Sequence, residues 1–363
     1  MRLGNNKDKK SASSSPSLGG RTFIGIDVSD HAVKMVQISG RSADQIKVES
    51  CAVTPLSQGV VTNGKVTNPS ELVVTLQQTV NRMGSVSKNV IFGAPNGIVT
   101  TQSFVYDPTS GVSLEESASF EATQISALDD INFDFQAVGD SSRKGQSVIL
   151  ALSKKEDLEP YLAVLDEAGL NPALVDVEPV ARANAYFWWI NKNSSDLEQS
   201  AVVTCDIGLE VSQVSILQDG AILYKQDFPV GGKHLTRELQ RECNVSATEA
   251  EQLKVSNSKP KEYQAVADKF NLQVAQEIQR VLQFFYTVSG SENVKKIERI
   301  FLTGGGCQSV GIAESVTTQS GIQTQILNPL EYASASGKVN QEQFKQNASR
   351  YTVAFGLALR GLV

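Results

Sequence analysis

The sequence repeats one pattern, TFIGIDVSDHAVKMVQI at residues 22–38 and AVVTCDIGLEVSQVSILQDGAILYKQDF at residues 201–228. In each copy an apolar run ends at an aspartate, Asp27 or Asp206, and a second apolar run follows after a short turn. Short runs rich in β-branched residues between turn residues predict strands. A third strand and then a helix are predicted after each pair of strands. The repeated order of strand, acidic turn, strand, strand and helix therefore predicts a duplicated α/β core.

Three further segments have clear patterns. Residues 69–83 follow Asn-Pro and precede Gly84, which predicts a helix with start and stop signals. Residues 100–171 indicate strand, helix, strand, strand and helix, an inserted small subdomain whose second helix would start at a capping box of Ser153 and Glu156. Residues 263–289 carry apolar side chains at helical spacing. We expect that stripe to pack within its own subdomain, although a partner could also bind it.

Composition excludes several classes of function. The chain has 363 residues and a net charge of −6, which disfavours nucleic acid as the main partner. Its 4 cysteines form no CxxC pair and only 2 histidines occur, which argues against zinc sites and Ser-His-Asp chemistry. No apolar run reaches the ~18 residues of a membrane span. Residues 1–20 are polar, which predicts a disordered tail, no signal peptide and a cytoplasmic protein.

The turn that contains Asp27 is the first candidate site. A tight hairpin points backbone N–H groups at an anion, and an acidic side chain at a strand end can hold hydrated Mg²⁺. Lys34, seven residues after Asp27, is placed to reach a terminal phosphate. An aspartate in a hairpin turn is also commonly a local hydrogen-bond cap, and this alternative stays open.

The second copy supplies two more candidates. Gly208, two residues after Asp206, would let a phosphate approach the backbone, and the Ser212 hydroxyl would donate to it. The apolar run before Gly304-Gly305-Gly306 predicts a strand that ends in a glycine-rich turn, which suits contact with a nucleotide. A triple glycine is equally consistent with a plain flexible loop.

The order of all these motifs makes them specific. They are the acidic hairpin, Val177-Glu178-Pro179-Val180-Ala181-Arg182-Ala183, Asp206-Ile207-Gly208, Gly231-Gly232, Glu251-Gln252-Leu253-Lys254 and Gly304-Gly305-Gly306. This order resembles the actin-like ATPases, in the bacterial branch that contains FtsA and MreB. The small insertion at residues 100–171 looks like the relocated subdomain of FtsA. From residue 21 to 363 the chain is most similar to the PilM family of type IV pilus assembly.

The resemblance implies an α/β, actin-like (ribonuclease-H-like, duplicated) ATPase fold of two lobes with a nucleotide cleft and an FtsA-like inserted subdomain. The implied divisions are a tail at 1–20, subdomain 1A at 21–99 and 172–200, the inserted subdomain 1C at 100–171, subdomain 2A at 201–230 and 299–363, and subdomain 2B at 231–298.

The resemblance also implies ATP and Mg²⁺ as ligands and gives each motif a role. Asp27 and Asp206 would position Mg²⁺ through water, Lys34 would contact the β- and γ-phosphates, and Gly208 with Ser212 would cradle the phosphates. Ser29, Gly231 and Gly232 would also bind the nucleotide. Glu251, Lys254, Gly304, Gly305 and Gly306 would face the nucleoside. Glu178 would orient the attacking water, or would simply cap the helix that begins near Pro179.

The first hairpin departs from the family pattern, which is close to Asp-x-Gly-Ser. Here Ser29, Asp30 and His31 form the tip, and Asp30 would bring negative charge toward phosphate unless it points to solvent. We therefore expect ATP binding with slow or undetectable hydrolysis.

The resemblance implies a partner as well, the cytoplasmic N-terminal tail of PilN, bound in a groove between the first core copy and residues 100–171. Through PilN the protein would join PilO and PilP and couple the inner-membrane alignment complex to the pilus motor ATPases, in pilus biogenesis and twitching motility. It would be peripheral to the inner membrane and could form a homo-oligomer. The alternative is an ATPase that hydrolyses ATP and polymerises like FtsA. Residues 351–363 favour the first hypothesis, because they indicate a helix of the second core copy and no amphipathic anchor.

Overall fold

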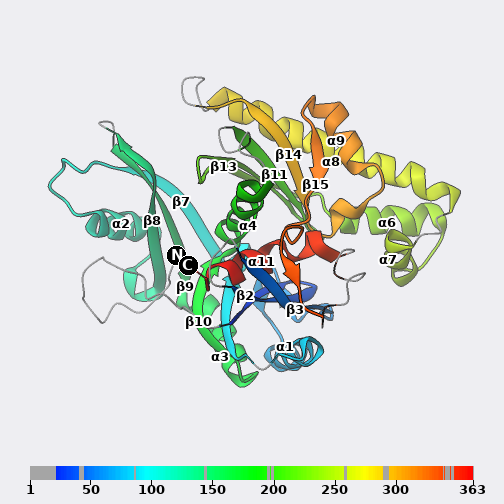
Figure 1. The fold of residues 1–363 in the computed structure, drawn as a ribbon, viewed down its shortest axis with the longest axis horizontal. Coiled ribbons are helices and arrows are strands. Elements are labelled where there is room, and N and C mark those ends of the chain that lie inside the picture. Colours follow the sequence, from blue (N-terminus) through cyan, green and yellow to red (C-terminus); the bar gives the residue numbers. More distant parts are fainter. Residues whose placement is uncertain are drawn as a thin grey trace. The chain divides into compact units, whose positions relative to one another are not determined.

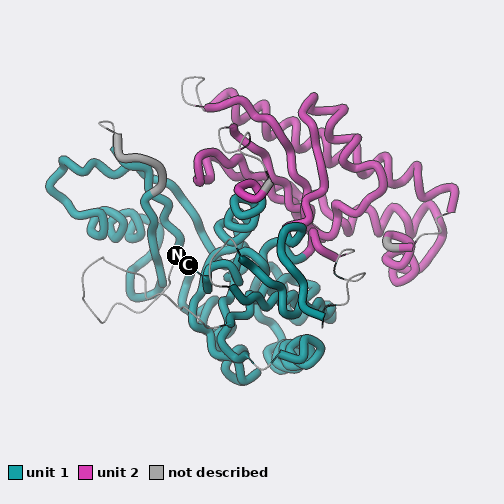
Figure 2. The backbone as a smooth tube through the Cα atoms, viewed as in Figure 1, with its two compact units in different colours: residues 1–189, 330–344, 351–363 teal, residues 190–329, 345–350 magenta. Residues whose placement is uncertain are grey.

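The computed structural model describes residues 22–40, 45–85, 87–142, 145–193, 197, 200–256, 260–288, 294–337, 339, 344 and 347–362. The predicted tail at 1–20 lies outside them. The chain forms two compact units (Figure 2): unit 1 is residues 1–189, 330–344 and 351–363, and unit 2 is residues 190–329 and 345–350. Each unit contains one copy of the repeated pattern, and the finer subdomain limits stay predictions.

Unit 1 is built on a six-stranded sheet in the order β10-β6-β1-β2-β3-β16 (Figure 1). Its strands are β1 (Phe23–Ser29), β2 (Ala32–Gly40), β3 (Ile46–Pro55), β6 (Asn89–Ala94), β10 (Asn171–Val177) and β16 (Ser334–Ala335). The first three form the antiparallel meander that the sequence predicts, and β6 pairs parallel with β1. A small hairpin of β4 (Val61–Thr62) and β5 (Lys65–Val66) precedes the first helix.

Helices cover the sheet of unit 1 on both faces. One hydrophobic cluster joins β1 and β6 to α1 (Pro69–Met83) and α3 (Lys155–Glu167), and another joins them to α4 (Glu178–Asn193) and α11 (Thr352–Leu359). As predicted, α1 has Asn68 as its N-cap and ends at Gly84, whose φ of 58° is left-handed.

The prediction that residues 351–363 belong to the second core copy is wrong, because α11 lies in unit 1 against β1. Val353 and Leu357 pack with Phe23, and a side chain at Gly25 would come within 1.9 Å of the Ala354 carbonyl oxygen. The absent side chain at Gly25 is what lets this apolar helix lie directly on the strand.

The inserted part of unit 1 has its own three-stranded antiparallel sheet in the order β7-β9-β8. Its elements are β7 (Val99–Tyr106), α2 (Leu114–Thr123), η2 (Leu128–Asp130), β8 (Ile131–Ser142) and β9 (Gly145–Lys154). A small core that includes Ala118, Ala122 and Leu150 holds α2 against this sheet. Figure 1 shows α2 beside the strands of this sheet. The predicted order of strand, helix, strand, strand and helix is confirmed.

The helix α3 differs from its prediction in two respects. It packs with the main core of unit 1 through Leu158, Tyr161 and Leu165, so residues 99–154 alone make up the inserted sheet and its small core. The predicted capping box is also wrong: the N-cap is Lys154, and the Ser153 hydroxyl donates to the Ile98 carbonyl oxygen at 2.7 Å. Ser153 still lies in β9, where a carbonyl from another segment is nearer than the N–H groups of α3.

Unit 2 contains a five-stranded sheet in the order β13-β12-β11-β14-β15. Its strands are β11 (Ala201–Ile207), β12 (Ser212–Gln218), β13 (Ala221–Phe228), β14 (Ile297–Thr303) and β15 (Thr324–Ile326). Its helices are α6 (Gly232–Cys243), α7 (Ala247–Val255), α8 (Lys261–Val288) and α9 (Ile312–Ser320), with short turns η3 (Gly306–Gln308) and η4 (Ala348–Tyr351).

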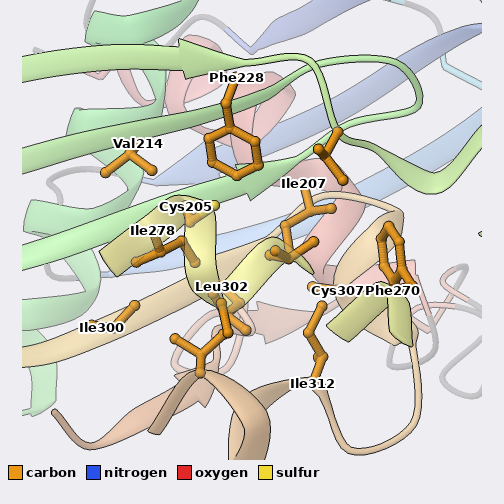
Figure 3. Packing of buried hydrophobic residues seen from close by; sticks show 14 of the residues in the cluster. Cys205, Ile207, Val214, Phe228, Phe270, Ile278, Ile300, Leu302, Cys307 and Ile312 are labelled. Carbon is orange, nitrogen blue, oxygen red and sulfur yellow. The ribbon is translucent and has the colours of Figure 1, made fainter. Parts of the chain in front are cut away.

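The long helix α8 confirms the prediction from residues 263–289. Val274, Ile278 and Phe285 of its stripe are buried in the core of unit 2, part of which Figure 3 shows around Cys205 and Ile207. The stripe therefore packs on its own unit. Among the described residues, no helix has the length and apolar character that crossing a membrane would require.

Candidate functional site

The β1–β2 hairpin brings Asp27 and Lys34 together. The two residues are opposite each other in the antiparallel register, and the Lys34 Nζ donates to the Asp27 Oδ2 at 2.7 Å. The side chain of Asp27 is only 3% exposed, whereas that of Lys34 is 18% exposed. The buried carboxylate thus holds a lysine that is itself partly open to solvent.

The tip of this hairpin is closed by local hydrogen bonds. The Ser29 hydroxyl donates to the Ala32 carbonyl oxygen at 3.1 Å. The two carboxylate oxygens of Asp30 accept from the backbone N–H groups of Asn63 at 2.8 Å and Gly64 at 2.9 Å. Neither expectation for Asp30 holds, because its charge faces two N–H donors of the β4–β5 turn rather than phosphate or solvent.

Glu178 is the first residue of α4. Its carboxylate lies 3.7 Å from the Arg182 guanidinium one turn later, and both side chains are largely buried. The nearby hydroxyl of Tyr161 has a raised pKa, first because it is buried and then because Asp30, Glu178 and Asp27 lie close to it. Burial and the negative charges of three carboxylates of unit 1 therefore act on the pKa of Tyr161 in the same direction.

In unit 2, the turn after β11 lies against the start of α6. A side chain at Gly208 would come within 2.5 Å of the Val211 carbonyl oxygen, and one at Gly231 would come within 2.5 Å of the Leu209 carbonyl oxygen. The Gly232 N–H donates to the Gly208 carbonyl oxygen at 2.8 Å. Both turns therefore require glycine at these positions.

The triple glycine after β14 is a fixed turn rather than a flexible loop. Gly304 has a φ of +84°, and a side chain there would come within 2.4 Å of the Ile207 carbonyl oxygen; at Gly306 it would meet the Ile207 side chain at 2.3 Å. Gly305 differs, since a side chain there would have only the Arg350 Nε within 4 Å, at 3.9 Å.

Glu251 and Lys254 lie on α7 beside these glycines. The Lys254 Nζ donates to the Gly232 carbonyl oxygen and to Glu251, each at 2.8 Å, and the Thr236 hydroxyl also bonds to Glu251. Burial lowers the pKa of Lys254, helped by the nearby Arg350 and opposed by Glu251. This face of unit 2 therefore holds a desolvated lysine at a glycine-lined surface.

The two remaining predicted site residues of unit 2, Asp206 and Ser212, differ in exposure to solvent. Asp206 is partly exposed, and its Oδ1 accepts from the Thr303 hydroxyl at 2.9 Å across the β11–β14 pair. Ser212 is fully buried, and its hydroxyl donates to the Val230 carbonyl oxygen at 2.6 Å. The predicted role of Ser212 as a phosphate donor does not fit this geometry, because the hydroxyl faces the interior.

Sequence reasoning missed Thr303, Thr236 and Arg350. The position of Thr303 directly before the glycine triplet could have indicated it, since parallel pairing sets it opposite Asp206. Nothing in the local sequence of Arg350 indicates that it lies beside Gly305, because a tertiary contact of unit 2 brings η4 there.

Comparison with solved structures places this geometry in a fold family. A PilM–PilN type IV pilus biogenesis complex matches with a TM-score of 0.80 at 23% identity, covering 94% of this chain and 98% of the other. The ethanolamine utilization protein EutJ of Carboxydothermus hydrogenoformans matches with a TM-score of 0.58 at 17% identity, covering 94% and 91%. MreB5 of Spiroplasma citri bound to ADP matches with a TM-score of 0.50 at 14% identity, covering 93% and 95%. These matches confirm the predicted actin-like fold.

The family comparison is more specific than the structural matches. The family described as type IV pilus assembly protein PilM matches residues 25–362, which is nearly the whole chain and includes every candidate site residue. The chain belongs to this PilM family of type IV pilus assembly proteins.

Proposed function

We propose that this chain is a nucleotide-binding interaction module of type IV pilus assembly, which binds Mg²⁺-ATP and holds the cytoplasmic N-terminal tail of PilN. The MreB5 structure in the same fold contains ADP, which supports a nucleotide as the ligand.

The main support for the nucleotide proposal is that the glycine-containing turns at Gly208, Gly232 and Gly306 lie close together in unit 2. The position of a side chain at Gly232 lies within 4 Å of the Gly208 carbonyl oxygen, the Gly306 Cα and the Lys254 Nζ. These glycines come from three segments far apart in the sequence. Backbone without side chains lets phosphate and sugar approach the N–H groups, and the N-terminus of α6 adds a favourable dipole for an anion. Glu251 and Gly304 would border the nucleoside.

The carboxylates suit a hydrated Mg²⁺ rather than direct coordination. Within the described residues no three acidic, His or Cys side chains are close enough to hold a metal ion. Asp206 has one oxygen bonded to Thr303 and is partly exposed, which fits an ion bound through water. Asp27 faces Lys34, so in this proposal it positions the lysine toward the β- and γ-phosphates and acts on Mg²⁺ only through water. The ion would offset phosphate charge.

Calorimetry with Mg²⁺-ATP tests this site through Gly305. Gly305 has room for a methyl group and a φ of −72°, so Gly305→Ala leaves the fold intact yet intrudes on a nucleotide that lies against the turn. We expect about tenfold weaker binding. Gly337→Ala is the matched control, because nothing lies within 4 Å of its new methyl group. Equal affinity in both variants would remove the glycine triplet from the site.

The metal is tested separately by thermal unfolding. Saturating Mg²⁺-ATP should raise the melting temperature of the wild type by mass action, and Asp206→Ala should abolish that shift. A shift of the same size in the variant would exclude Asp206 from metal binding.

We further propose that hydrolysis is slow. Glu178 lies 3.7 Å from Arg182, so its carboxylate is already engaged in an ion pair. Phosphate release should stay far below the ~10 s⁻¹ typical of enzymes. Turnover at that rate, lost in Glu178→Ala, would favour the FtsA-like ATPase instead.

The partner proposal rests on the inserted sheet of unit 1. Residues 99–154 expose large apolar side chains, among them Val105 at 69% and Phe120 at 63%. Both belong to the same small subdomain, which suits covering by an apolar tail. The solved complex with a TM-score of 0.80 contains PilN, which supports this partner. In the proposed arrangement the tail lies in a groove beside the first core copy.

Hydrogen exchange with a synthetic PilN tail peptide tests the location. The peptide should bind in the micromolar range or tighter and protect amides of Thr100–Tyr106, whereas a scrambled peptide should not. Binding without protection anywhere in residues 100–171 would contradict the groove while leaving PilN as the partner.

The wider assembly follows from PilN in this proposal. A chain that holds the tail of an inner-membrane protein is cytoplasmic and peripheral to that membrane, and it reaches PilO, PilP and the motor ATPases through the complex. Co-purification from cells tests these partners, and the size of the purified protein tests a homo-oligomer.

A further inference from the structure

The Asp30 carboxylate ties the β1–β2 hairpin to a second turn of unit 1. Its two oxygens accept from the N–H groups of Asn63 and Gly64 at 2.8 and 2.9 Å. Asn63 and Gly64 form the turn between β4 and β5, with left-handed φ values of 53° and 75°. Both N–H groups point the same way in this turn, so one carboxylate satisfies both donors.

The same turn is held from its other side by α3. The Tyr161 hydroxyl donates to the Gly64 carbonyl oxygen at 2.9 Å, and its ring packs on Phe92 with centroids 5.0 Å apart. Tyr161 is buried, at 1% exposed. The turn is therefore fixed between the hairpin tip and the core helix that directly follows β9.

The turn also rests on the start of the inserted sheet. A side chain at Gly97 would come within 2.1 Å of the Asn63 carbonyl oxygen, so the two backbones are in direct contact. Gly97 belongs to η1 (Asn96–Ile98), which leads straight into β7. The Ile98 carbonyl oxygen accepts from Ser153 near the end of β9 at 2.7 Å. Both strands that enter and leave the inserted sheet are thus joined to the turn.

We propose that Asp30 is a positioning residue, which transmits nucleotide occupancy of the β1–β2 hairpin to the inserted sheet and so changes the affinity of that sheet for its peptide partner. This inference rests on the proposed function. Every connection is a short hydrogen bond or a backbone contact, so a shift of the hairpin tip must move the turn and then the root of β7. Coupling of this kind is reciprocal: the peptide must change nucleotide affinity by the same factor.

The carboxylate is specifically required for this link. An asparagine offers one acceptor oxygen, and its NH₂ group would face an N–H donor, so Asp30→Asn breaks at least one of the two bonds. Tyr161→Phe removes only the hydroxyl bond to Gly64 and keeps the ring in place. The two variants interrupt the same connection at different points.

The experiment measures the peptide dissociation constant with and without saturating Mg²⁺-ATP, using the whole chain and a synthetic PilN tail. In the wild type we expect saturating nucleotide to change the dissociation constant of the peptide at least fivefold, a usual size for coupling between two sites. In Asp30→Asn and Tyr161→Phe the two constants should agree within twofold, while Tyr161→Phe binds each ligand alone as the wild type does. The matched control is Tyr224→Phe in unit 2, which loses one hydrogen bond from its hydroxyl to Gln226. In this variant the nucleotide should change the peptide dissociation constant by the same factor as in the wild type.

The possible failures are distinguishable. A wild type that binds neither ligand overturns the proposed function, and this inference with it. If the wild type binds both ligands but the nucleotide does not change peptide affinity, the role of Asp30 is overturned and the proposed function stands. The same holds if the nucleotide changes peptide affinity in Asp30→Asn and Tyr161→Phe as much as in the wild type.

Discussion

At the scale of single residues, the Lys34–Asp27 ion pair matters both for the proposed phosphate binding and for the stability of the fold. Asp27 is almost fully buried, and the Lys34 ammonium is 2.7 Å from it. A buried carboxylate that loses its partner retains the penalty of leaving water. Any change at Lys34 therefore affects folding as well as phosphate binding.

Replacing Lys34 should destabilise the chain far more than replacing a matched lysine. Lys34→Met should lower the free energy of unfolding by about 3 kcal/mol, because Asp27 is left unpaired in the interior. Lys65→Met removes a pair of similar length, 2.8 Å to Asp157, but Lys65 is 56% exposed and its loss should hardly register. Chemical denaturation of both variants measures the difference, and equal effects would show that Asp27 is better solvated than its burial implies.

Cys307 makes stability depend on alkaline pH. Its thiol donates to the Gly304 carbonyl oxygen at 3.1 Å, and burial raises its pKa from 9.0 to about 12. Above pH 9 the unfolded thiol releases its proton while the folded one keeps it, so stability falls as the pH rises toward 12. Between pH 8 and about 10.5 this amounts to about 2 kcal/mol. Cys307→Ala should reduce the loss by that amount in denaturation curves; an unchanged pH profile would contradict the raised pKa.

Residue chemistry was predictable where both partners lie in one local motif. The hairpin that contains Asp27 and Lys34 was predicted, and its antiparallel register sets the two residues opposite each other. Asp30 and Ser212 were not predictable, because their partners are backbone groups of other segments. A sequence shows which side chains can bond, but only the fold shows which carbonyl or N–H group arrives beside them.

At the scale of elements, the inserted sheet is attached to unit 1 through neighbouring strand ends. Thr101 in β7 is directly opposite Ala151 in β9. Antiparallel partners are only about 5 Å apart at their Cα atoms, so a two-residue turn can join them. The sheet can therefore be removed without stretching the remaining core.

A chain in which Asn-Gly replaces residues 102–150 should fold and still bind Mg²⁺-ATP, but should no longer bind the PilN tail peptide. The reason is that the nucleotide candidates lie outside the removed segment, whereas its exposed apolar side chains lie within it. Circular dichroism and calorimetry check both parts. Peptide binding by the shortened chain would place the partner site elsewhere on the molecule.

Elements with complete boundary signals were the most predictable. The helix α1 has Asn68-Pro69 at its start and Gly84 at its end, as predicted. The start of α3 was misplaced because Ser153 and Glu156 have capping-box spacing, yet the strand pairing of β9 continues through Lys154. Pairing with β8 outweighed a local cap.

At the scale of the whole molecule, recruitment to a membrane should require the partner. Vesicles that display a lipid-linked PilN tail should carry the chain upward in a flotation gradient, whereas plain vesicles of the same lipids should not. The chain lacking residues 102–150 is the control and should stay at the bottom with both. Flotation with plain vesicles would show a membrane affinity of the chain itself.

The duplication was predictable from the repeated strand pattern, and the two units confirm it. The return of the C-terminal segment to unit 1 was not predictable, because residues 353–359 carry only apolar side chains or glycine and suit either core. Gly25 and Gly356 decide the outcome: each allows backbone contact within unit 1 that a side chain would prevent.

Because α11 returns to unit 1, unit 1 can be completed only after most of unit 2 has been synthesised. Unit 1 begins near the N-terminus but receives β16 only at residue 334 and α11 only at residues 352–359, after nearly all of unit 2 has been made. On the ribosome, the surface of β1 and β6 that α11 covers stays uncovered until residues 352–359 have been made. An incomplete chain consequently lacks a finished first unit, and prematurely terminated products are substrates for chaperones and proteases rather than competitors for the pilus machinery.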